Sequence, residues 1–231
     1  MPEALHSSVL ETLGREITGG QLGPGSVLTL ERLQRRFGVS RTVARECMRL
    51  LEQLQLVTSR RRVGIVVRPQ EEWDVLDPRV IRWRLGGPGR IAQLRTLSEM
   101  RAAVEPFAAA RAAQFATDAE RAEISALGTE LVVVGEVGAR ADYIALDIAF
   151  HASLLRASRN ELFVALIGAV GEVIGGRSHN GVVPRDPSLA SLAAHEAVAR
   201  AVAEADAPLA ERSMRELLTD LRVLVADLDG R

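Results

Sequence analysis

The chain has 231 residues, and its 29 basic residues, all Arg, nearly balance 30 acidic ones, for a formal net charge of -1. Hydrophobic residues make up 47% of the chain and aromatic residues only 3%, which excludes a disordered chain and predicts a large aliphatic core. The one cysteine, Cys47, excludes an internal disulfide. Since no segment is typical of a signal peptide or a membrane span, we expect a cytoplasmic protein.

The charge is unevenly divided along the chain. Residues 1–69 contain 11 Arg and 6 acidic residues, a formal charge of +5, whereas residues 70–231 contain 18 Arg and 24 acidic residues, a formal charge of -6. A basic N-terminal segment followed by an acidic remainder is typical of a nucleic-acid-binding domain joined to a domain with another function. We therefore expect a DNA-binding domain over 1–69, a linker over 70–89 and a second domain over 90–231.

The basic part of the chain has the pattern of a winged helix-turn-helix. A helix over 6–19 ends in a segment rich in glycine. Residues 30–56 then give a short helix, a GVS turn and a second helix, for which Ser40 is a good N-cap. The basic stretch RRRVGIVV over 60–67 follows, and Gly64 suits the turn of a two-stranded wing. Three helices and a two-stranded wing are therefore predicted.

The second helix of this motif carries two different faces. Apolar residues recur at helical spacing on one face, while Arg41, Arg45 and Arg49 stack four residues apart on another, with Thr42 beside them. Arginine can clamp the edge of a guanine or grip a phosphate, and helix N-terminal amides also favour phosphate. A solvated helix face is the alternative, but the motif and the basic wing favour sequence-specific binding of duplex DNA.

The second half of the chain is almost entirely helical in pattern. Within the linker we expect a short helix over 80–85 and a break at 86–89. Beyond residue 90, Ala, Leu and Val recur at spacings of three and four, so the fold class is mainly α, with an all-α bundle of about six helices. The predicted helices span 90–115, 118–136, 139–157, 160–178, 185–205 and 207–227.

Three residues of the predicted bundle are candidate metal ligands. Asp147 and His151 are four residues apart and therefore project from the same face of a helix. His195, on another predicted helix, is positioned to add a third ligand across the bundle. A salt-linked surface pair or a hydrogen-bonded core histidine is the alternative interpretation of Asp147 and His151.

Four further residues are candidates for binding an anionic effector. Arg101 forms a pair four residues from Glu105, and it either grips an anion inside the bundle or makes an ordinary pair on the helix surface. Arg177 and His179 end a predicted helix, where they either line a pocket mouth or complement the helix C-terminus. Asn160 completes this predicted effector site.

Several segments of the chain resemble those of a known family. The GVSRTVARECMRLLEQLQLV segment and the wing are similar to the winged helix of GntR regulators. Three blocks of the second half resemble the FCD effector-binding domain of the FadR subfamily, and the WDVLDPRVIRW linker resembles that of sugar-acid regulators, the galactonate type in particular. The three blocks are LRTLSEMRAAVEPFAAARAA (94–113), DIAFHASLLRASRNELF (147–163) and HEAVARAVAEADAPLAERSMREL (195–217).

The resemblance implies a set of DNA contacts in the first domain. Many relatives have an arginine on DNA where this chain has Glu31, so Arg32 or Arg35 is expected to compensate from a neighbouring position. The full predicted set is Arg32, Arg35, Arg41, Thr42, Arg45, Arg49, Arg62 and Gly64.

The resemblance also implies a divalent metal held by one Asp and three His. Asp147, His151 and His195 match three of these positions, but Leu217 stands where the fourth histidine is expected. Three protein ligands with water or an effector carboxylate can still hold an ion, for which Zn²⁺ is favoured and Mn²⁺ or Ni²⁺ are alternatives.

The combined interpretation is a dimeric repressor, not an enzyme. A small carboxylate such as a sugar acid is expected to bind in the bundle and change the affinity for double-stranded operator DNA. We expect a homodimer on a pseudo-palindromic operator and no membrane partner. Two alternatives stay open: a constitutive DNA-binding protein whose effector pocket has decayed, and a non-haem metal enzyme that uses Asp147, His151 and His195.

Overall fold

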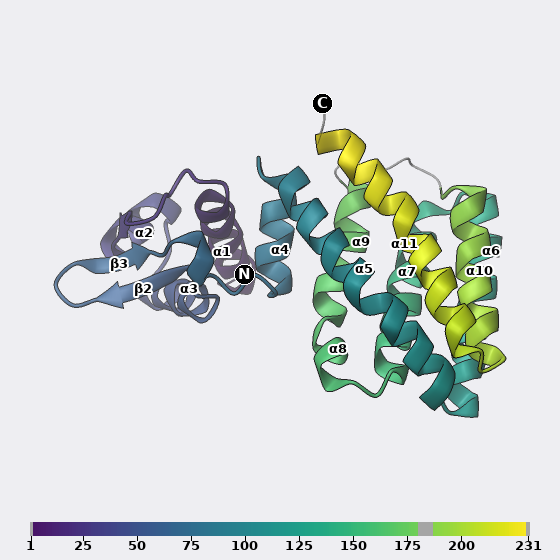
Figure 1. Ribbon diagram of the computed structural model, residues 1–231. Helices are drawn as coiled ribbons and strands as arrows, with labels where there is room; N and C mark the ends of the chain where they lie inside the picture. The colour runs from purple at the N-terminus through teal and green to yellow at the C-terminus, as the bar shows by residue number, and fades with distance from the viewer. Residues whose placement is uncertain (1, 180–186, 230–231) are drawn as a thin grey trace. The chain divides into compact units, whose positions relative to one another are not determined.

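The computed structural model describes the backbone of residues 2–179 and 187–229, and the side chains of 7–176 and 187–219. The chain divides into two compact units, Met1–Arg90 and Ile91–Arg231 (Figure 1). Helices dominate both units, and the described strands all belong to the first, as expected for a mainly α protein.

The first unit is a winged helix-turn-helix, as predicted. Thr29 and Ser40 cap its second and third helices, since their side chains accept hydrogen bonds from the amides of Arg32 and Val43. Gly38 ends the second helix at φ 65°, a left-handed conformation that favours glycine. In chain order its elements are α1 (Pro2–Thr18), β1 (Val27–Leu28), α2 (Leu30–Phe37), α3 (Arg41–Gln53), β2 (Val57–Arg60), β3 (Gly64–Val67), the 3₁₀ turn η1 (Gln70–Glu72) and α4 (Pro78–Leu85).

The wing belongs to a sheet of three strands rather than two. β2 and β3 form the predicted hairpin, in which Arg60 pairs with Gly64. β1 adds to the other side of β3 with Val27 opposite Val66, so the strand order is β1-β3-β2 and every pairing is antiparallel. A strand of two residues has no periodicity, which is why the sequence did not predict β1.

The segment predicted as a linker packs on α1. The Trp83 side chain, on α4, is 1% exposed, and its Nε1 donates a hydrogen bond of 2.9 Å to Glu11 Oε2. Its ring lies so close to Gly14 that a Cβ added there would stand 2.5 Å from ring atoms. Trp73 and Val80 join the same apolar cluster as the helix-turn-helix core. The first unit therefore extends beyond the wing.

The second unit consists of helices throughout its described residues. The predicted helix over 160–178 was wrong as a single element, because the chain breaks at Leu166 into α8 and α9. Nothing in the sequence around Leu166 explains this break. The helices are α5 (Arg90–Phe115), α6 (Asp118–Val137), α7 (Arg140–Ala157), α8 (Glu161–Ala165), α9 (Ile167–His179), α10 (Leu189–Ala203) and α11 (Ala207–Asp229). Among the residues that the structure describes, no helix is both long and apolar enough to span a membrane.

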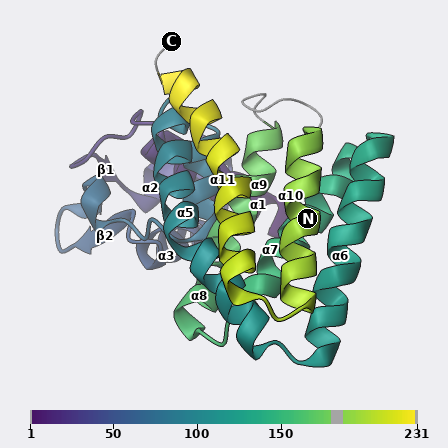
Figure 2. The same cartoon turned by 45° about the vertical axis from the view of Figure 1, so that its right-hand side comes forward.

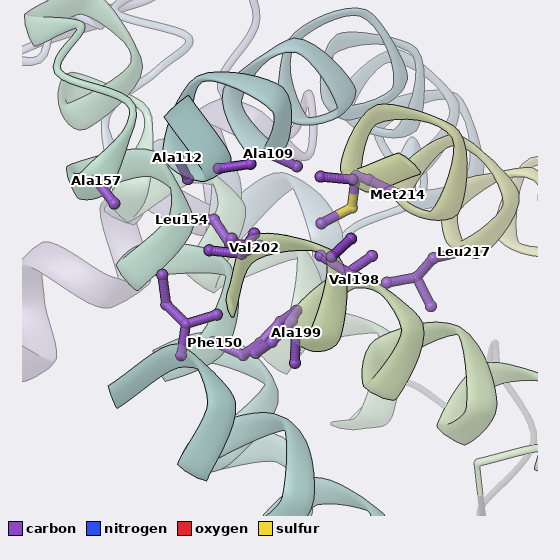
Figure 3. Close-up of a cluster of buried hydrophobic side chains, with 14 of the residues drawn as sticks. Ala109, Ala112, Phe150, Leu154, Ala157, Val198, Ala199, Val202, Met214 and Leu217 are labelled. Atoms are coloured by element: carbon purple, nitrogen blue, oxygen red, sulfur yellow. The ribbon is translucent and has the colours of Figure 1, made fainter. Parts of the chain in front are cut away.

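The bundle packs around an aliphatic core. α10 packs against both α6 and α11, and α7 packs against α6 and α9 (Figure 2). Figure 3 shows the core side chains, among them Phe150, Val198, Met214 and Leu217. A Cβ on Gly128 of α6 would lie 2.5 Å from the Cβ of Ala199, so a residue without a side chain permits this close approach of α6 and α10.

Candidate functional site

The exposed face of α3 is a candidate DNA-binding surface. Arg41, Thr42 and Arg45 are exposed on this helix, whereas Cys47 and Leu51 on the opposite face are fully buried. Burial therefore divides the helix along the two faces that the sequence pattern predicted. The Ser40 cap begins the helix next to Arg41, which places this arginine at the positive end of the helix dipole.

The remaining predicted DNA contacts lie on α2, on α3 and in the wing. Arg32 and Arg35 are exposed on α2, and Arg49, also exposed, lies 3.8 Å from Glu46 in a weak pair on α3. Arg62 is exposed at the wing tip, where its φ of 65° is left-handed, and Gly64 has a φ of 117°. A Cβ on Gly64 would lie 3.0 Å from the backbone oxygen of Leu28, so the hairpin needs glycine here.

Inside the bundle, the structure brings the three candidate metal ligands together. Asp147 and His151 come from α7 and His195 from α10, and all three are buried, at 6%, 2% and 2% exposure. His151 Nε2 lies 3.1 Å and His195 Nε2 lies 3.2 Å from the same oxygen, Asp147 Oδ1. One ligand atom from each residue falls within 4.8 Å of the others.

The opposite ring nitrogen of each histidine faces an acceptor. Nδ1 of His151 lies 2.5 Å from Glu105 Oε2, and Nδ1 of His195 lies 2.7 Å from the backbone oxygen of Ser191. Both Nδ1 atoms are therefore placed to donate. A protonated ring also donates from Nε2–H to Asp147, whereas a neutral ring directs its Nε2 lone pair there. Two lone pairs facing one carboxylate oxygen repel unless a cation or a proton lies among them.

Arg101 lies beside this cluster and is 1% exposed. Its Nε lies 2.5 Å from Glu105 Oε1, and its Nη2 lies 3.1 Å from His151 Nε2. Its third nitrogen, Nη1, is buried and has no hydrogen-bond partner among the described residues. The alternative of an ordinary pair on the helix surface is therefore wrong, because Arg101 and Glu105 lie inside the bundle.

Burial and the contacts among these side chains shift the pKa values of Glu105, Asp147 and His151. Burial alone would raise the pKa of Glu105, but the charges of Arg101 and His151 lower it to about 2. Burial likewise opposes ionisation of Asp147, while hydrogen bonds from His151 and His195 hold its pKa well below the ordinary value. Burial would lower the pKa of His151, yet the Glu105 carboxylate raises it. Both carboxylates are therefore anions at neutral pH.

The donor set of the cluster fits a divalent cation. Two imidazole nitrogens and a carboxylate oxygen are typical ligands of Zn²⁺, and each histidine has the outer acceptor that commonly orients a metal-binding ring. Leu217, where a fourth histidine was expected, lies in the apolar cluster and is 9% exposed. The described residues thus supply three candidate protein ligands, and a bound ion would take any further ligand from outside this set.

The other predicted effector residues have different outcomes. Asn160 caps α8, because its Oδ1 accepts a hydrogen bond of 3.0 Å from the amide of Leu162. This cap is a structural task that the sequence analysis did not assign to Asn160. The side chains of Arg177 and His179 lie outside the described residues.

Sequence reasoning missed the outer contacts of the cluster. Glu105 was noted only as a helix partner of Arg101, and Ser191 was not singled out. Glu105 is separated from His151 by 46 positions, so only the register between α5 and α7 reveals the contact. One signal was available: Glu105 is an acidic residue in the middle of an apolar helix segment, where an unpaired charge is costly.

Comparisons with known proteins give a consistent assignment. Residues 5–67 match the model of the bacterial regulatory proteins of the gntR family, and residues 96–220 match the FCD domain. The galactonate operon transcriptional repressor of Escherichia coli is 29% identical over 209 residues, which cover 89% of this chain and 90% of the relative. The HTH-type transcriptional regulator Rv0494 of Mycobacterium tuberculosis is 34% identical over 174 residues, which cover 74% of this chain and 69% of that relative.

A solved structure supports the fold over most of the chain. Escherichia coli McbR/YncC matches with a TM-score of 0.56 at 18% identity, and the match covers 97% of this chain and 98% of that one.

Proposed function

The chain belongs to the GntR family of bacterial transcription regulators and carries an FCD domain, and we propose that it is a repressor controlled by a small carboxylate. Its matches are regulators of transcription, so it is not an enzyme, and the metal-enzyme alternative is set aside. The observation that carries the proposal is the buried Asp147, His151 and His195 cluster beside Arg101, whose Nη1 has no partner among the described residues.

DNA binding is assigned to the exposed arginines of the first unit. Arg41 and Arg45 lie at the start of α3 with no ion pair recorded to any described residue, which leaves both guanidiniums available to bases or phosphates. Arg32, Arg35 and Arg62 are proposed to contact the phosphate backbone from α2 and the wing. A homodimer would place two such heads on a pseudo-palindromic operator.

The proposed metal centre uses Asp147, His151 and His195 as protein ligands. Zn²⁺ is favoured by the nitrogen and oxygen donors, with Mn²⁺ and Ni²⁺ as alternatives. When bound, such an ion polarises and orients an anionic ligand. The chain's own residues do the rest: Glu105 and the backbone oxygen of Ser191 orient the two imidazoles, and the surrounding helices exclude water.

Charge balance favours an anionic effector at this centre. With neutral imidazoles, the described groups Arg101, Glu105 and Asp147 carry a net charge of -1. A divalent cation reverses the sign of that charge, and one carboxylate then neutralises it, which a buried site favours. Arg101 Nη1 offers an unpaired N–H donor of the kind that binds carboxylates. The name of the galactonate relative makes a sugar acid the first class to try.

Fluorescence anisotropy with DNA from upstream of the protein's own gene tests the DNA-binding part. Arg45→Ala is expected to weaken binding by about 1–3 kcal/mol at fixed salt, a loss of about 5- to 150-fold. The matched control is Arg15→Ala, which removes an exposed arginine from α1 whose side chain is 65% exposed. Equal affinity of the Arg45 variant and the parent would overturn the assignment.

Thermal shift with a panel of carboxylic acids tests the effector part. In the parent loaded with zinc, one class of acid is expected to raise the melting temperature, because a ligand that binds only the folded state stabilises it. Arg101→Met and Asp147→Ala are expected to abolish this shift. A parent that no acid stabilises would instead favour the decayed pocket, with Leu217 as the lost ligand.

A further inference from the structure

The carboxylate of Glu105 serves two different partners with its two oxygens. Oε1 lies 2.5 Å from Arg101 Nε, and Oε2 lies 2.5 Å from His151 Nδ1 and 3.2 Å from Arg101 Nη2. Glu105 is 2% exposed, so water does not compete effectively for these oxygens. A single side chain thus contacts both the candidate metal centre and the candidate anion-binding arginine.

The contact with His151 determines which ring nitrogen carries the proton. An ionised carboxylate only accepts hydrogen bonds, and Glu105 Oε2 lies 2.5 Å from Nδ1 of His151, whereas Asp147 Oδ1 lies 3.1 Å from Nε2. A neutral ring therefore keeps its proton on Nδ1, toward the closer carboxylate. In the neutral ring, Nε2 is then unprotonated, and it is Nε2 that lies 3.1 Å from Asp147 Oδ1 among the candidate ligand atoms. Without the carboxylate, the opposite tautomer gains a hydrogen bond from Nε2–H to Asp147 and loses its ability to bind a metal.

The contact between Glu105 and Arg101 determines which guanidinium nitrogen of Arg101 has no hydrogen-bond partner among the described residues. Glu105 engages Nε and Nη2, the two nitrogens on one edge of the guanidinium. Nη1 lies outside this pairing and has no partner among the residues that the structure describes. The same carboxylate therefore fixes the orientation in which Arg101 presents a free donor.

We propose that Glu105 is the positioning residue of this site, because it holds His151 in the tautomer that binds a metal through Nε2 and turns Nη1 of Arg101 toward the effector. This inference rests on the proposed metal centre of Asp147, His151 and His195. Glu105 itself does not bind the metal; it acts through the two side chains that it orients.

An amide cannot replace this carboxylate, and this makes the proposal testable. In Glu105→Gln one carboxylate oxygen is replaced by an NH₂ group, which donates hydrogen bonds. His151 Nδ1–H and the Arg101 guanidinium are both donors, so each requires an acceptor. If the oxygen stays with Arg101, the NH₂ group faces His151 Nδ1 and favours the tautomer with the proton on Nε2. The substitution keeps the volume of the side chain, so its effect on packing is small.

The experiment is a titration of metal-free protein with zinc in competition with a chromophoric chelator. Glu105→Gln is expected to weaken zinc binding by about 10- to 100-fold, the usual effect of losing an outer contact of a metal ligand. Glu105→Asp retains the negative charge and is expected to lose less zinc affinity than Glu105→Gln. Glu99→Gln makes the same substitution at an exposed position of α5 and is expected to bind zinc like the parent.

Loss of charge and loss of orientation must be separated. The double variant Arg101→Met/Glu105→Leu leaves the net charge of the site unchanged, offers no acceptor to His151 Nδ1 and leaves no unpaired buried arginine, which protects the fold if the single variant is unstable. Zinc binding is still expected to be weaker than in the parent. Long-range ¹H–¹⁵N spectra, at zinc levels that saturate only the parent, are expected to place the His151 proton on Nδ1 in the parent and on Nε2 in Glu105→Gln and in the double variant.

The possible results separate a failure of the role proposed for Glu105 from a failure of the proposed metal centre. If Asp147→Ala loses zinc while Glu105→Gln and the double variant stay within about threefold of the parent, the centre stands and the positioning role is wrong. An Nδ1 proton on His151 in the variants would also overturn it. If Asp147→Ala binds zinc as tightly as the parent, the proposed centre and the role of Glu105 both fail.

Discussion

Because Gly14 contacts Trp83, the effect of Gly14→Ala on the free energy of unfolding is expected to change sign when Trp83 is also replaced. In the parent, a Cβ at position 14 would lie 2.5 Å from ring atoms of Trp83, so Gly14→Ala overpacks this part of the core. Overpacking costs about 1–3 kcal/mol, while replacing a helical glycine by alanine gains about 1 kcal/mol. Gly14→Ala is therefore expected to destabilise the parent by up to about 2 kcal/mol.

In a Trp83→Ala background the ring is gone and only the gain in helix propensity is left. Trp83→Ala alone is expected to cost about 3–5 kcal/mol, because it removes a side chain that is 1% exposed together with its hydrogen bond to Glu11. Adding Gly14→Ala to that variant is expected to restore about 1 kcal/mol, unless the emptied site collapses onto α1.

Urea unfolding followed by circular dichroism at 222 nm measures this cycle. Since the chain has two compact units, the relevant transition is the one that Trp83→Ala moves to lower urea. The reasoning predicts a coupling energy of about 1–3 kcal/mol between the two positions. It is refuted if Gly14→Ala changes the stability by the same amount and in the same direction in both backgrounds.

Three further predictions concern buried groups. Burial raises the pKa of the Cys47 thiol to about 11, so Ellman's reagent is expected to react with it only on unfolding, and fast reaction of native protein would contradict its buried position. Gly128→Ala places a Cβ 2.5 Å from the Cβ of Ala199 and is expected to lower the free energy of unfolding of the second unit by up to about 2 kcal/mol, the overpacking cost less the gain in helix propensity; a higher urea midpoint would refute the close approach of α6 and α10. Since the pKa of His151 is raised in the folded state, its protonation stabilises metal-free protein fully below about pH 6.5 and less as pH rises through the folded value. Urea midpoints of the metal-free parent should therefore fall above about pH 6.5 relative to His151→Leu, and parallel pH profiles would exclude this contribution.

The DNA-binding unit was predictable because its signals are local. Helical periodicity fixes the buried and exposed faces of α3 within a few turns, and Ser40 marks where that helix begins. β1 was missed because two residues carry no pattern, and its pairing with β3 joins segments about 40 positions apart. Trp83 was assigned to a linker because nothing near it in sequence indicates that it packs against Gly14.

The candidate site was predictable only where its residues share a helix or a family motif. Asp147 and His151 follow from helical spacing, whereas His195 was added on the possibility of a contact across the bundle and on the family resemblance. The contact of Glu105 with His151 depends on the register of two helices, which no local pattern encodes. Ser191 contributes only its backbone oxygen, so its side-chain identity carries no signal.

We propose that a carboxylate bound at the Asp147, His151 and His195 cluster controls the affinity for DNA. The most direct measurement is anisotropy of labelled upstream DNA, at fixed salt, for zinc-loaded parent and Asp147→Ala across a panel of aldonic, uronic and simple carboxylic acids. One class of acid is expected to change the DNA affinity of the parent by about 5- to 150-fold and to leave the affinity of the variant unchanged. Tight binding that no acid alters, or an equal response of the parent and the variant, would contradict it.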